Sequence, residues 1–577
     1  MRDLRVWQRR TERGLALLTA VAVTWAILVH TKALHAAYRA PVRARHGMVV
    51  SASDLASRVG LRILQEGGNA VDAAVATGFA LAVTLPEAGN LGGGGFMVIR
   101  FPDGRATTID YRERAPLAAT RDMYLDSVGR FQPQKSTFGY LASGTPGSVA
   151  GLCYALQHYG TLPLQKVIAP AVELARKGYR LDYWAARTLA QHADRFRFFP
   201  GAAAIFLKDG TEPYSEGDLF VQKDLAHTLQ LIADQGPEVF YTGEIADKIA
   251  SEFAEHGGLI TKRDLAEYRA IERPPVTGYY RGHRILSMGP PSSGGIVLVE
   301  ALNILEGFDL RHWLPGSSTT YHLIAEALRR AFADRAAFLG DADFVRVPVA
   351  GLTSKAYADS LRRTIALDRA SSSASVRHGD PWRFEAGETT HYVVVDAQRM
   401  AVSVTTTING TFGSHVVVPG TGFLMNNEMD DFSARPGVPN MFGLVGSEAN
   451  AIAPGKRMLS SMTPTIVEQD DSLWFVIGSP GGPRIISTVL QAIINAVDFE
   501  MNAQAAISAP RVHHQWLPDV LYYEPEVPID VRQSLVALGH RLRRFSEIGR
   551  AKSIMVSTDG ALWGGVDPRG PGLAVGY

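Results

Sequence analysis

A pair of adjacent threonines, Thr389 and Thr390, could supply a nucleophile for catalysis. The pair follows a stretch rich in Ser, Gly and charged residues and precedes a run of β-forming residues. Threonines at the start of a strand ordinarily reflect β-propensity alone. However, a threonine hydroxyl becomes a useful nucleophile when a base lies beside it, and the α-amino group of an N-terminal threonine is such a base. Cleavage of the bond between Glu388 and Thr389 would therefore place nucleophile and base on one residue.

Other sequence patterns for catalysis are absent. The chain holds no HExxH zinc helix, no Gly-x-Ser-x-Gly elbow and no phosphate-binding loop that ends in Gly-Lys-Ser/Thr. His513 and His514 are adjacent, so in a strand they would point to opposite faces and make a poor metal pair. The single cysteine, Cys153, excludes a multi-cysteine zinc site and an intrachain disulfide.

A hairpin is expected to position the threonine pair. Two β-rich segments, residues 390–396 and 400–407, flank a short polar turn at residues 397–399. The preceding stretch, residues 368–388, has too few apolar side chains to offset its ordering entropy, so we expect it to be disordered. A flexible segment next to a regular hairpin is the natural place for a chain break.

The first residues are expected to form a targeting segment. Five arginines within the first 13 residues precede an uncharged apolar run between Gly14 and Val29. This pattern is typical of a secretion signal or a signal-anchor, and the arginines would keep the N-terminus in the cytoplasm. The rest of the chain is then exported. Its 20% of charged residues and net charge of +1 give no support for a nucleic-acid partner.

From residue 47 onward the sequence predicts both strands and helices. The glycine-rich stretch at residues 90–96 precedes a strand and lacks a following Gly-Lys-Ser/Thr, so we expect close backbone packing there and no phosphate site. Strands are predicted at residues 47–52, 96–101, 106–111, 279–287, 413–418, 422–426, 465–469 and 473–478. Helices are predicted at residues 54–65, 70–83, 148–158, 164–177, 181–193, 222–235, 244–256, 296–305, 319–338 and 485–495.

Seven short motifs occur in order between residues 89 and 519. They are GNLGGGGF (89–96), DYRERAP (110–116), TTHYVVVD (389–396), NNEMDDFS (426–433), LSSMTPT (459–465), GSPGGPR (478–484) and HHQWLPD (513–519). In these motifs the chain resembles the gamma-glutamyltransferases, also called gamma-glutamyl transpeptidases or glutathione hydrolases, of the N-terminal-nucleophile hydrolase superfamily. The resemblance covers nearly all of the chain from about residue 47 to residue 577.

The resemblance implies a fold and a processing event. The fold would be of the α+β class, a four-layer αββα sandwich of two stacked sheets between helical layers. Thr389 would attack the Glu388 carbonyl and divide the precursor into a large chain (37–388) and a small catalytic chain (389–577), which form a heterodimer. Residues 1–36 would be the signal or signal-anchor segment.

The resemblance also implies a substrate site with groups of both charges, because a γ-glutamyl donor carries an α-carboxylate and an α-ammonium. The residues that match the carboxylate site of the family are Arg112, Ser460 and Ser461. Those that match its ammonium site are Glu428 and Asp431, with Asn409 beside them. Some members of the family carry Gln at the position of Glu428, and either side chain can accept a hydrogen bond from an ammonium group.

The remaining implied roles belong to catalysis. Thr407 matches the threonine whose hydroxyl hydrogen-bonds the nucleophile, and Thr405 is its near companion. The backbone N–H groups of Gly481 and Gly482 match the oxyanion hole. Phe442 lies in a loop that resembles a lid, at a position where some bacterial relatives carry Tyr.

The implied reaction is a ping-pong acyl transfer. Thr389 would take the γ-glutamyl group from glutathione or a related compound as an ester, and water, an amino acid or a peptide would accept it. This chemistry requires neither a metal nor an organic cofactor. Two alternatives stay open. One is a cephalosporin or glutaryl acylase of the same superfamily, which need not retain the charged site. The other is an uncleaved binding protein tethered to the membrane.

Overall fold

The structure, a computed structural model, describes residues 39–384 and 394–577. Its main compact unit spans Val42–Tyr577. The apolar run between Gly14 and Val29 and the expected cleavage site at Glu388 and Thr389 lie outside the described residues. In the part of the chain that the structure describes, no helix is both long and apolar enough to cross a membrane.

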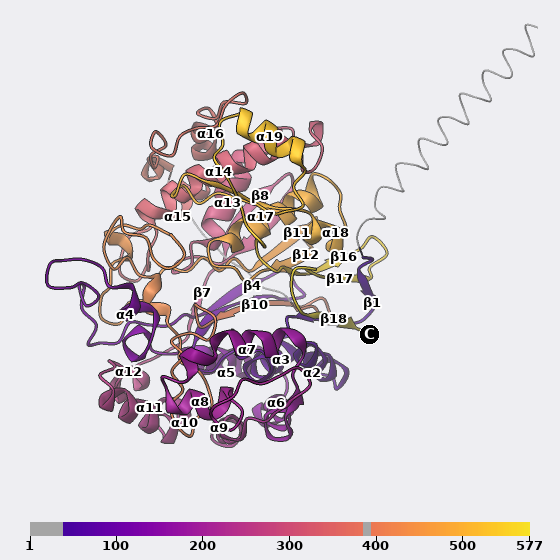
Figure 1. Cartoon of the computed structure of the whole chain (residues 1–577). Helices are drawn as coiled ribbons and strands as arrows, with labels where there is room; N and C mark the ends of the chain where they lie inside the picture. The colour runs from indigo at the N-terminus through magenta and orange to yellow at the C-terminus, as the bar shows by residue number, and fades with distance from the viewer. Residues whose placement is uncertain (1–38, 385–393) are drawn as a thin grey trace, which may run out of the picture. The chain divides into compact units, whose positions relative to one another are not determined.

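Two sheets form the interior of the compact unit (Figure 1). Strand β10 lies against β11 and β12, so the sheets stack face to face. The antiparallel four-stranded sheet has the order β10 (Ala401–Thr407), β3 (Gly94–Arg100), β4 (Ala106–Tyr111) and β7 (Ile271–Arg273). The seven-stranded sheet has the order β1 (Val42–Ala44), β17 (Leu562–Val566), β16 (Lys552–Val556), β12 (Ser472–Gly478), β11 (Thr465–Gln469), β9 (His283–Ser287) and β8 (Val276–Tyr280).

Helices cover the outer faces of both sheets. On the four-stranded sheet lie α3 (Ala70–Thr84) and α5 (Ser148–Tyr159), and on the seven-stranded sheet lie α13 (Gly294–Glu306) and α17 (Arg484–Val497). A further long helix, α14 (Ser318–Phe338), packs on α13. The order helix, sheet, sheet, helix confirms the expected four-layer αββα sandwich (Figure 1).

Shorter and outlying elements complete the compact unit. The remaining helices are α2 (Asp54–Gln65), α4 (Pro133–Thr137), α6 (Leu164–Lys177), α7 (Tyr183–Phe196), α8 (Pro200–Phe206), α9 (Lys223–Gln235), α10 (Glu238–Tyr241), α11 (Glu244–Glu255), α12 (Lys262–Ala266), α15 (Val349–Thr353), α16 (Lys355–Arg362), α18 (Ala503–Ser508) and α19 (Ile529–Ala537). The remaining strands are β2 (Met48–Ser51), which pairs with β18 (Leu573–Gly576), and β5 (Tyr179–Arg180), β6 (Leu219–Phe220), β13 (Val512–His513), β14 (Leu521–Tyr523) and β15 (Leu542–Arg544).

Helix α3 joins the outer layer to the hairpin turn. Asn69 and Asp72 form a capping box, in which the Asn69 side chain accepts from the backbone of the first turn and Asp72 accepts from the Asn69 N–H at 2.8 Å. The Asp396 carboxylate accepts from the Ala70 N–H at 3.0 Å and also from two N–H groups of its own turn. One buried carboxylate therefore fixes the hairpin turn to the start of the helix.

The glycine run before β3 allows strand β10 to lie close to its neighbours. Register pairs Thr407 with Gly94 and Thr405 with Phe96. A Cβ atom on Gly95 would lie 2.5 Å from the Thr405 carbonyl oxygen, and one on Gly93 would overlap the Thr407 carbonyl oxygen. The expectation of close backbone packing is confirmed.

Three predicted strands are wrong. The segment at residues 279–287 is part of a hairpin of β8 and β9, which turns at Arg281 and Gly282, both with positive φ. The segments at residues 413–418 and 422–426 contain turns and two isolated bridges, one between Val417 and Leu424 and one between Met425 and Gly92, in place of the expected strands. Gly413 and Gly422 adopt positive φ there, and each lies against neighbouring backbone, so the chain is too sharply bent for a continuous ladder.

The stretch before the expected cleavage site is more ordered than its composition predicts. Residues 368–384 of it are described, and Ser373 is buried, donates its N–H to Asp519 at 2.8 Å and accepts from Arg329. A short 3₁₀ turn follows at Pro381–Phe384. Polar contacts to buried arginine and aspartate replace the apolar contacts that the sequence lacks, so the expectation of disorder is wrong for these residues.

The hairpin itself is confirmed only in part. The turn at residues 397–399 is closed by a 2.9 Å hydrogen bond from the Asp396 N–H to the Met400 carbonyl oxygen, and the second arm is β10. Of the first arm the structure describes residues 394–396. There Val395 forms isolated bridges to Met48 and Ala401 and no continuous strand.

Candidate active site

A buried cluster of charged side chains lies where β4 ends. Arg112 is 1% exposed and forms ion pairs of 2.7 Å with Glu428 and 2.6 Å with Asp431. Glu113, also buried, approaches Arg112 to 3.5 Å. The Met458 carbonyl oxygen accepts from Arg112 Nε at 3.3 Å. One guanidinium group therefore faces three carboxyl groups in a region that excludes water.

Burial raises the pKa of each of these carboxyl groups. The pKa of Glu428 rises to about 7 because burial outweighs the opposing effect of Arg112. Burial and the nearby Glu428 raise the pKa of Glu113 well above its ordinary value. Burial also raises the pKa of Asp431, although Arg112 opposes it. Because one arginine cannot neutralise three buried carboxylates, the cluster favours any additional cation that enters it.

Two of the three acidic residues of the cluster, Glu428 and Asp431, lie at the ends of a short 3₁₀ turn, Glu428–Asp431. Asn426, fully buried before this turn, donates to the carbonyl oxygens of Gly92 and Gly144 and accepts from the Glu428 N–H at 3.1 Å. Asp430 accepts instead from Ser136 at 2.6 Å and from the Met441 N–H at 2.9 Å. Adjacent aspartates thus have separate tasks: Asp431 contacts Arg112, and Asp430 holds the loop that follows.

Thr407 lies between the charge cluster and a cavity. Its Oγ accepts from the Asn409 N–H at 2.7 Å, and its hydroxyl lies close enough to Glu428 to lower the pKa of that carboxyl group. Asn409 has a φ of 71° and donates its side-chain amide to the Asn427 carbonyl oxygen at 3.0 Å. Thr405 and Thr407 are two residues apart in β10, so their side chains leave the same face of the strand.

The cavity has a volume of about 610 Å³ and lies beside Thr405 and Asn409. Gly481 and Gly482 also line it, immediately before α17. Both glycines have positive φ, and the ring of Phe442 would lie 3.0 Å from a Cβ atom on Gly482. The N-terminus of a helix presents backbone N–H groups and a partial positive charge, so this edge of the cavity suits a developing oxyanion.

Ser460 and Ser461 connect to a second arginine, Arg335. Ser461 Oγ accepts from Arg335 Nη2 at 3.1 Å, and Ser460 Oγ accepts from the Met462 N–H at 3.1 Å. Ser293 donates both its N–H and its hydroxyl to the Ser460 carbonyl oxygen, at 2.8 and 2.6 Å. Arg335 Nε donates to Ser293 Oγ at 2.9 Å.

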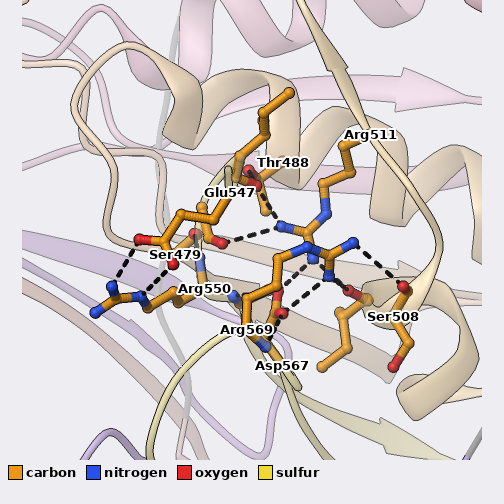
Figure 2. A network of polar contacts seen from close by, with 12 residues as sticks. Ser479, Thr488, Ser508, Arg511, Glu547, Arg550, Asp567 and Arg569 are labelled. Carbon is orange, nitrogen blue, oxygen red and sulfur yellow. Dashed lines mark hydrogen bonds and ion pairs between the residues drawn. The ribbon is translucent and has the colours of Figure 1, made fainter. Parts of the chain in front are cut away.

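A second polar network includes Ser479, which directly precedes the segment with Gly481 and Gly482 (Figure 2). Ser479 accepts from the Arg550 N–H at 3.0 Å, and Arg550 pairs with Glu547 at 2.6 Å. Deeper in the molecule, Arg511 and Arg569 both bind Asp567. Arg569 also pairs with Glu524 at 2.6 Å. This network holds the segment around residue 549, whose backbone packs against Gly481.

Two groups of histidines can be tested as metal ligands. Among the described residues, ligand atoms of His322, Glu326 and His540 lie near enough to one another to share an ion. These atoms already have partners: His322 Nδ1 contacts His540 Nε2 at 2.8 Å, and Glu326 pairs with Arg330 at 2.7 Å. His513 contacts Ser487, whereas His514 approaches Asp519, so that adjacent pair does not converge. Neither group fits a metal ion well.

The structure brings most of the expected site residues together. Arg112, Thr407, Glu428 and Asp431 form one cluster, and a cavity beside it is lined by Thr405, Asn409, Gly481 and Gly482. Ser460 and Ser461 belong to the adjoining Arg335 contacts, and Glu388 and Thr389 lie outside the described residues. The sequence did not indicate Arg335, which is one of three arginines in a predicted helix, nor Asn440, which donates to Asp431 at 3.3 Å.

Comparisons with known proteins cover nearly the whole chain. A family model described as gamma-glutamyltranspeptidase matches residues 56–577. The glutathione hydrolase proenzyme of Escherichia coli (strain K12) is 52% identical over 539 residues, which cover 93% of each chain. The crystal structure of cephalosporin acylase from Bacillus halodurans matches with a TM-score of 0.83 at 31% identity, over 93% of this chain and 97% of that one. The structure of Helicobacter pylori gamma-glutamyltranspeptidase matches with a TM-score of 0.58 at 48% identity, over 58% of this chain and 96% of that one.

Proposed function

Because the chain belongs to the gamma-glutamyltranspeptidase family, we propose that it is an autoprocessing threonine enzyme that cleaves γ-glutamyl amides, with glutathione as a donor. The observation that carries this proposal is the contact of Arg112 with Glu428 and Asp431 beside Thr407. The α-carboxylate and the α-ammonium of a γ-glutamyl group stand on one carbon atom. A site for both must hold a cation and an anion side by side, and this cluster does so.

Processing would begin with Thr389. Its hydroxyl attacks the Glu388 carbonyl, the peptide C–N bond breaks, and an ester forms as the Thr389 amino group is released. Water then hydrolyses the ester, which leaves a large chain of residues 37–388 and a small chain of residues 389–577. The match of both residues to the family motif supports this step, and the two chains together would form the active heterodimer.

Catalysis would use the same hydroxyl. The α-amino group of Thr389 takes the hydroxyl proton, and Oγ attacks the γ-carbonyl carbon of the donor. The N–H groups of Gly481 and Gly482 would stabilise the oxyanion, a contribution of about 3 kcal/mol for each donor. Proton transfer to the leaving amine yields a γ-glutamyl ester. Water, an amino acid or a peptide then accepts the γ-glutamyl group, and none of these reaction steps uses a metal or an organic cofactor.

The two ends of the donor would be bound by different parts of the cluster. The α-carboxylate would meet Arg112 with the hydroxyls of Ser460 and Ser461. The α-ammonium would meet Glu428 and Asp431, with Asn409 and Thr405 close by. Burial raises the pKa of both acids, to about 7 for Glu428, so an ammonium group beside them would stabilise their charged forms.

An acylase that removes glutaryl side chains is a second candidate, because a cephalosporin acylase matches this fold over 93% of the chain. A glutaryl group carries a terminal carboxylate and no ammonium. It would leave Glu428 and Asp431 without their cation and would add a further negative charge to a buried, acid-rich site. The cluster therefore favours γ-glutamyl donors.

The location of the enzyme follows from its first residues. We place the processed heterodimer on the periplasmic or extracellular face, secreted or tethered through the apolar run between Gly14 and Val29. The arginines before that run and its length support export. N-terminal sequencing of both mature chains distinguishes a cleaved signal from a retained anchor.

The decisive experiment compares the wild-type protein with Thr389→Ala. On a denaturing gel the wild type should give bands of roughly 40 and roughly 20 kDa, scaled from 62.5 kDa, and the variant one uncut band. Hydrolysis of a chromogenic γ-glutamyl anilide should fall by at least about 10⁴-fold in the variant. Thr390→Ser is the matched control and should still be cut.

Three results would count against the proposal. A single wild-type band that binds but does not turn over γ-glutamyl compounds would favour the uncleaved binding protein. Faster hydrolysis of a glutaryl anilide than of the γ-glutamyl anilide would favour the acylase. A Thr389→Ala protein that is still cut and still turns over substrate would remove Thr389 as the nucleophile.

A further inference from the structure

Arg335 is a buried cation without a carboxylate partner. It lies in the last turn of α14 and is 5% exposed. Its side-chain hydrogen bonds go to Ser293 at 2.9 Å and Ser461 at 3.1 Å, and no ion pair of Arg335 occurs among the described residues. An arginine keeps its charge in a protein, and a buried charge without a counter-ion is costly.

Other buried arginines of the same helix are paired. Arg329 and Arg330 both contact Glu326, at 3.2 and 2.7 Å. Arg335 lies about one and a half turns further along the helix and is near Asp431 of the charge cluster. Burial lowers its pKa more than Asp431 raises it, which leaves a pKa of about 10. The side chain is therefore still a cation at neutral pH, and the cluster is its nearest source of negative charge.

We propose that Arg335 is a positioning residue for the donor: it directs the Ser461 hydroxyl toward the α-carboxylate and supplies the second positive charge that this carboxylate needs. The proposal rests on the proposed function and adds a residue to it. Ser461 Oγ accepts from Arg335, so one of its lone pairs is occupied and its proton is turned away from the arginine. No acceptor for that proton occurs among the described contacts.

The charge balance of the site gives Arg335 its role. In the empty site, both ends of the Arg112 guanidinium group are taken by Glu428 and Asp431. When the ammonium group of a donor meets those two acids, its carboxylate enters beside them and must not face a net negative charge. Arg335 offsets one acid and Arg112 the other, so a zwitterion can bind without an uncompensated buried charge.

The test compares two donors that differ only in the α-carboxylate: γ-glutamyl anilide, which has it, and 4-aminobutyryl anilide, which lacks it. In Arg335→Met the KM for γ-glutamyl anilide should rise about 10- to 100-fold, the effect of losing a charge-assisted contact, while kcat changes by less than about threefold. For 4-aminobutyryl anilide, kcat/KM should stay within about threefold of the wild-type value. Arg335→Lys, which keeps the charge but cannot bridge two serines, should lie between the wild type and Arg335→Met.

Competitive inhibition gives a second readout if the 4-aminobutyryl donor turns over too slowly. The inhibition constant of free glutamate should rise in Arg335→Met as KM does, and that of 4-aminobutyrate should not. Arg330→Lys is the matched control, because Arg330 is a buried arginine of the same helix that contacts Glu326 and Thr364 and not Ser461. It should leave the ratio of the kcat/KM values for the two donors unchanged.

The outcomes separate this inference from the proposed function. A wild-type protein that does not turn over γ-glutamyl anilide defeats the proposed function. If the wild type turns over γ-glutamyl anilide, and kcat/KM of Arg335→Met falls equally for both donors or falls for neither, only the role of Arg335 is defeated. Failure of both Arg335 variants to be processed would also overturn it, because positioning of the donor is not needed for cutting the precursor.

Discussion

The cluster around Arg112 and the network around Asp567 are both buried and both consist of arginines and carboxylates, but their charges balance differently. In the network, Arg511 and Arg569 share Asp567, and Arg569 also pairs with Glu524, so two cations meet two anions (Figure 2). In the cluster, Glu113, Glu428 and Asp431 all pair with Arg112, and the only other arginine that acts on them, Arg335, affects Asp431 without an ion pair among the described residues.

The pKa values follow this difference. Burial raises the pKa of Asp567, but Arg511 and Arg569 outweigh burial and hold it below its ordinary value, whereas at Glu524 burial prevails. In the cluster burial prevails at all three acids. A balanced buried network serves as scaffold, and an acid-rich one leaves room for the positive charge of a ligand.

Asp431→Asn should have the largest effect, and on activity only. It removes an anion that would pair with the ammonium group of the donor, so kcat/KM for γ-glutamyl anilide should fall about 10³-fold, or about 4 kcal/mol. The melting temperature should hardly change, because the substitution relieves the excess of buried acid. Steady-state kinetics and thermal unfolding measure both.

Glu113→Gln is the matched control inside the same cluster. Burial and the nearby Glu428 raise its pKa well above the ordinary value, which favours the neutral form, and an uncharged amide of the same shape replaces that form closely. We expect kcat/KM to stay within about threefold of the wild type. If Glu113→Gln and Asp431→Asn reduce activity alike, the cluster acts as scaffold and the comparison fails.

Asp567→Asn should have the opposite effect to Asp431→Asn, because it should lower stability and not activity. Removing one partner of a buried ion pair leaves two arginines undercompensated, so the free energy of unfolding should drop by about 3 kcal/mol. Because the folded pKa of Asp567 is lowered, the stability that it contributes is present above the ordinary Asp range and is lost as the pH falls through the lowered pKa. Urea unfolding at several pH values measures the loss.

An exposed aspartate, Asp559, provides the control for Asp567. Asp559→Asn breaks an exposed pair with Arg43 and should leave the urea midpoint unchanged. The KM of the folded Asp567→Asn protein should stay within about twofold of the wild type. A KM that rises as steeply as in Asp431→Asn would make the network part of the donor site.

Glu428→Gln should have the smallest effect, visible only as a pH dependence. Since the pKa of Glu428 is about 7, the wild-type side chain loses its proton between pH 6 and pH 8 and attracts the ammonium group more strongly. The KM of the wild type should fall about threefold over this range, and that of the variant should stay flat. Titration of the Thr389 amino group would affect kcat in both proteins and serves as the internal reference.

Stability should respond to pH in the reverse direction. A carboxyl group whose folded pKa is raised stabilises the protein fully below its unfolded pKa, and this contribution is lost as the pH rises through about 7. The melting temperature of the wild type should therefore decline relative to Glu428→Gln between pH 5 and pH 8. KM profiles that run parallel in the two proteins would show that Glu428 does not meet the ammonium group.

The sequence predicted the helices and strands of the scaffold better than it predicted the contacts between the side chains of the site. Apolar periodicity and caps located helices such as α2 and α3, and motif order placed Arg112, Glu428 and Asp431 at one site. The strands predicted around Gly413 and Gly422 did not form, because glycines that take positive φ against neighbouring backbone override the β-forming residues there.

Arg335 and the direct pairing of Arg112 with both acids could not be predicted from single positions. Both depend on which buried groups face one another after α14, the 3₁₀ turn and the loop before β11 have packed, and burial of a charge leaves no mark in the sequence. The order of residues 368–384 was missed for the same reason, because its partners Arg329 and Asp519 lie far away along the chain.

The strand order of the two sheets determines what a cut before residue 389 would do to the molecule. Four strands from after that point, β17, β16, β12 and β11, lie between β1 on one side and β9 and β8 on the other, and β10 pairs with β3. The break would remove none of the strand pairs formed by the described residues. Separation of the two pieces would, however, require both sheets to open and their backbone N–H and C=O groups to lose their partners. Dissociation and unfolding would then be one event, so the two pieces should melt together, at a temperature that falls when the protein is diluted.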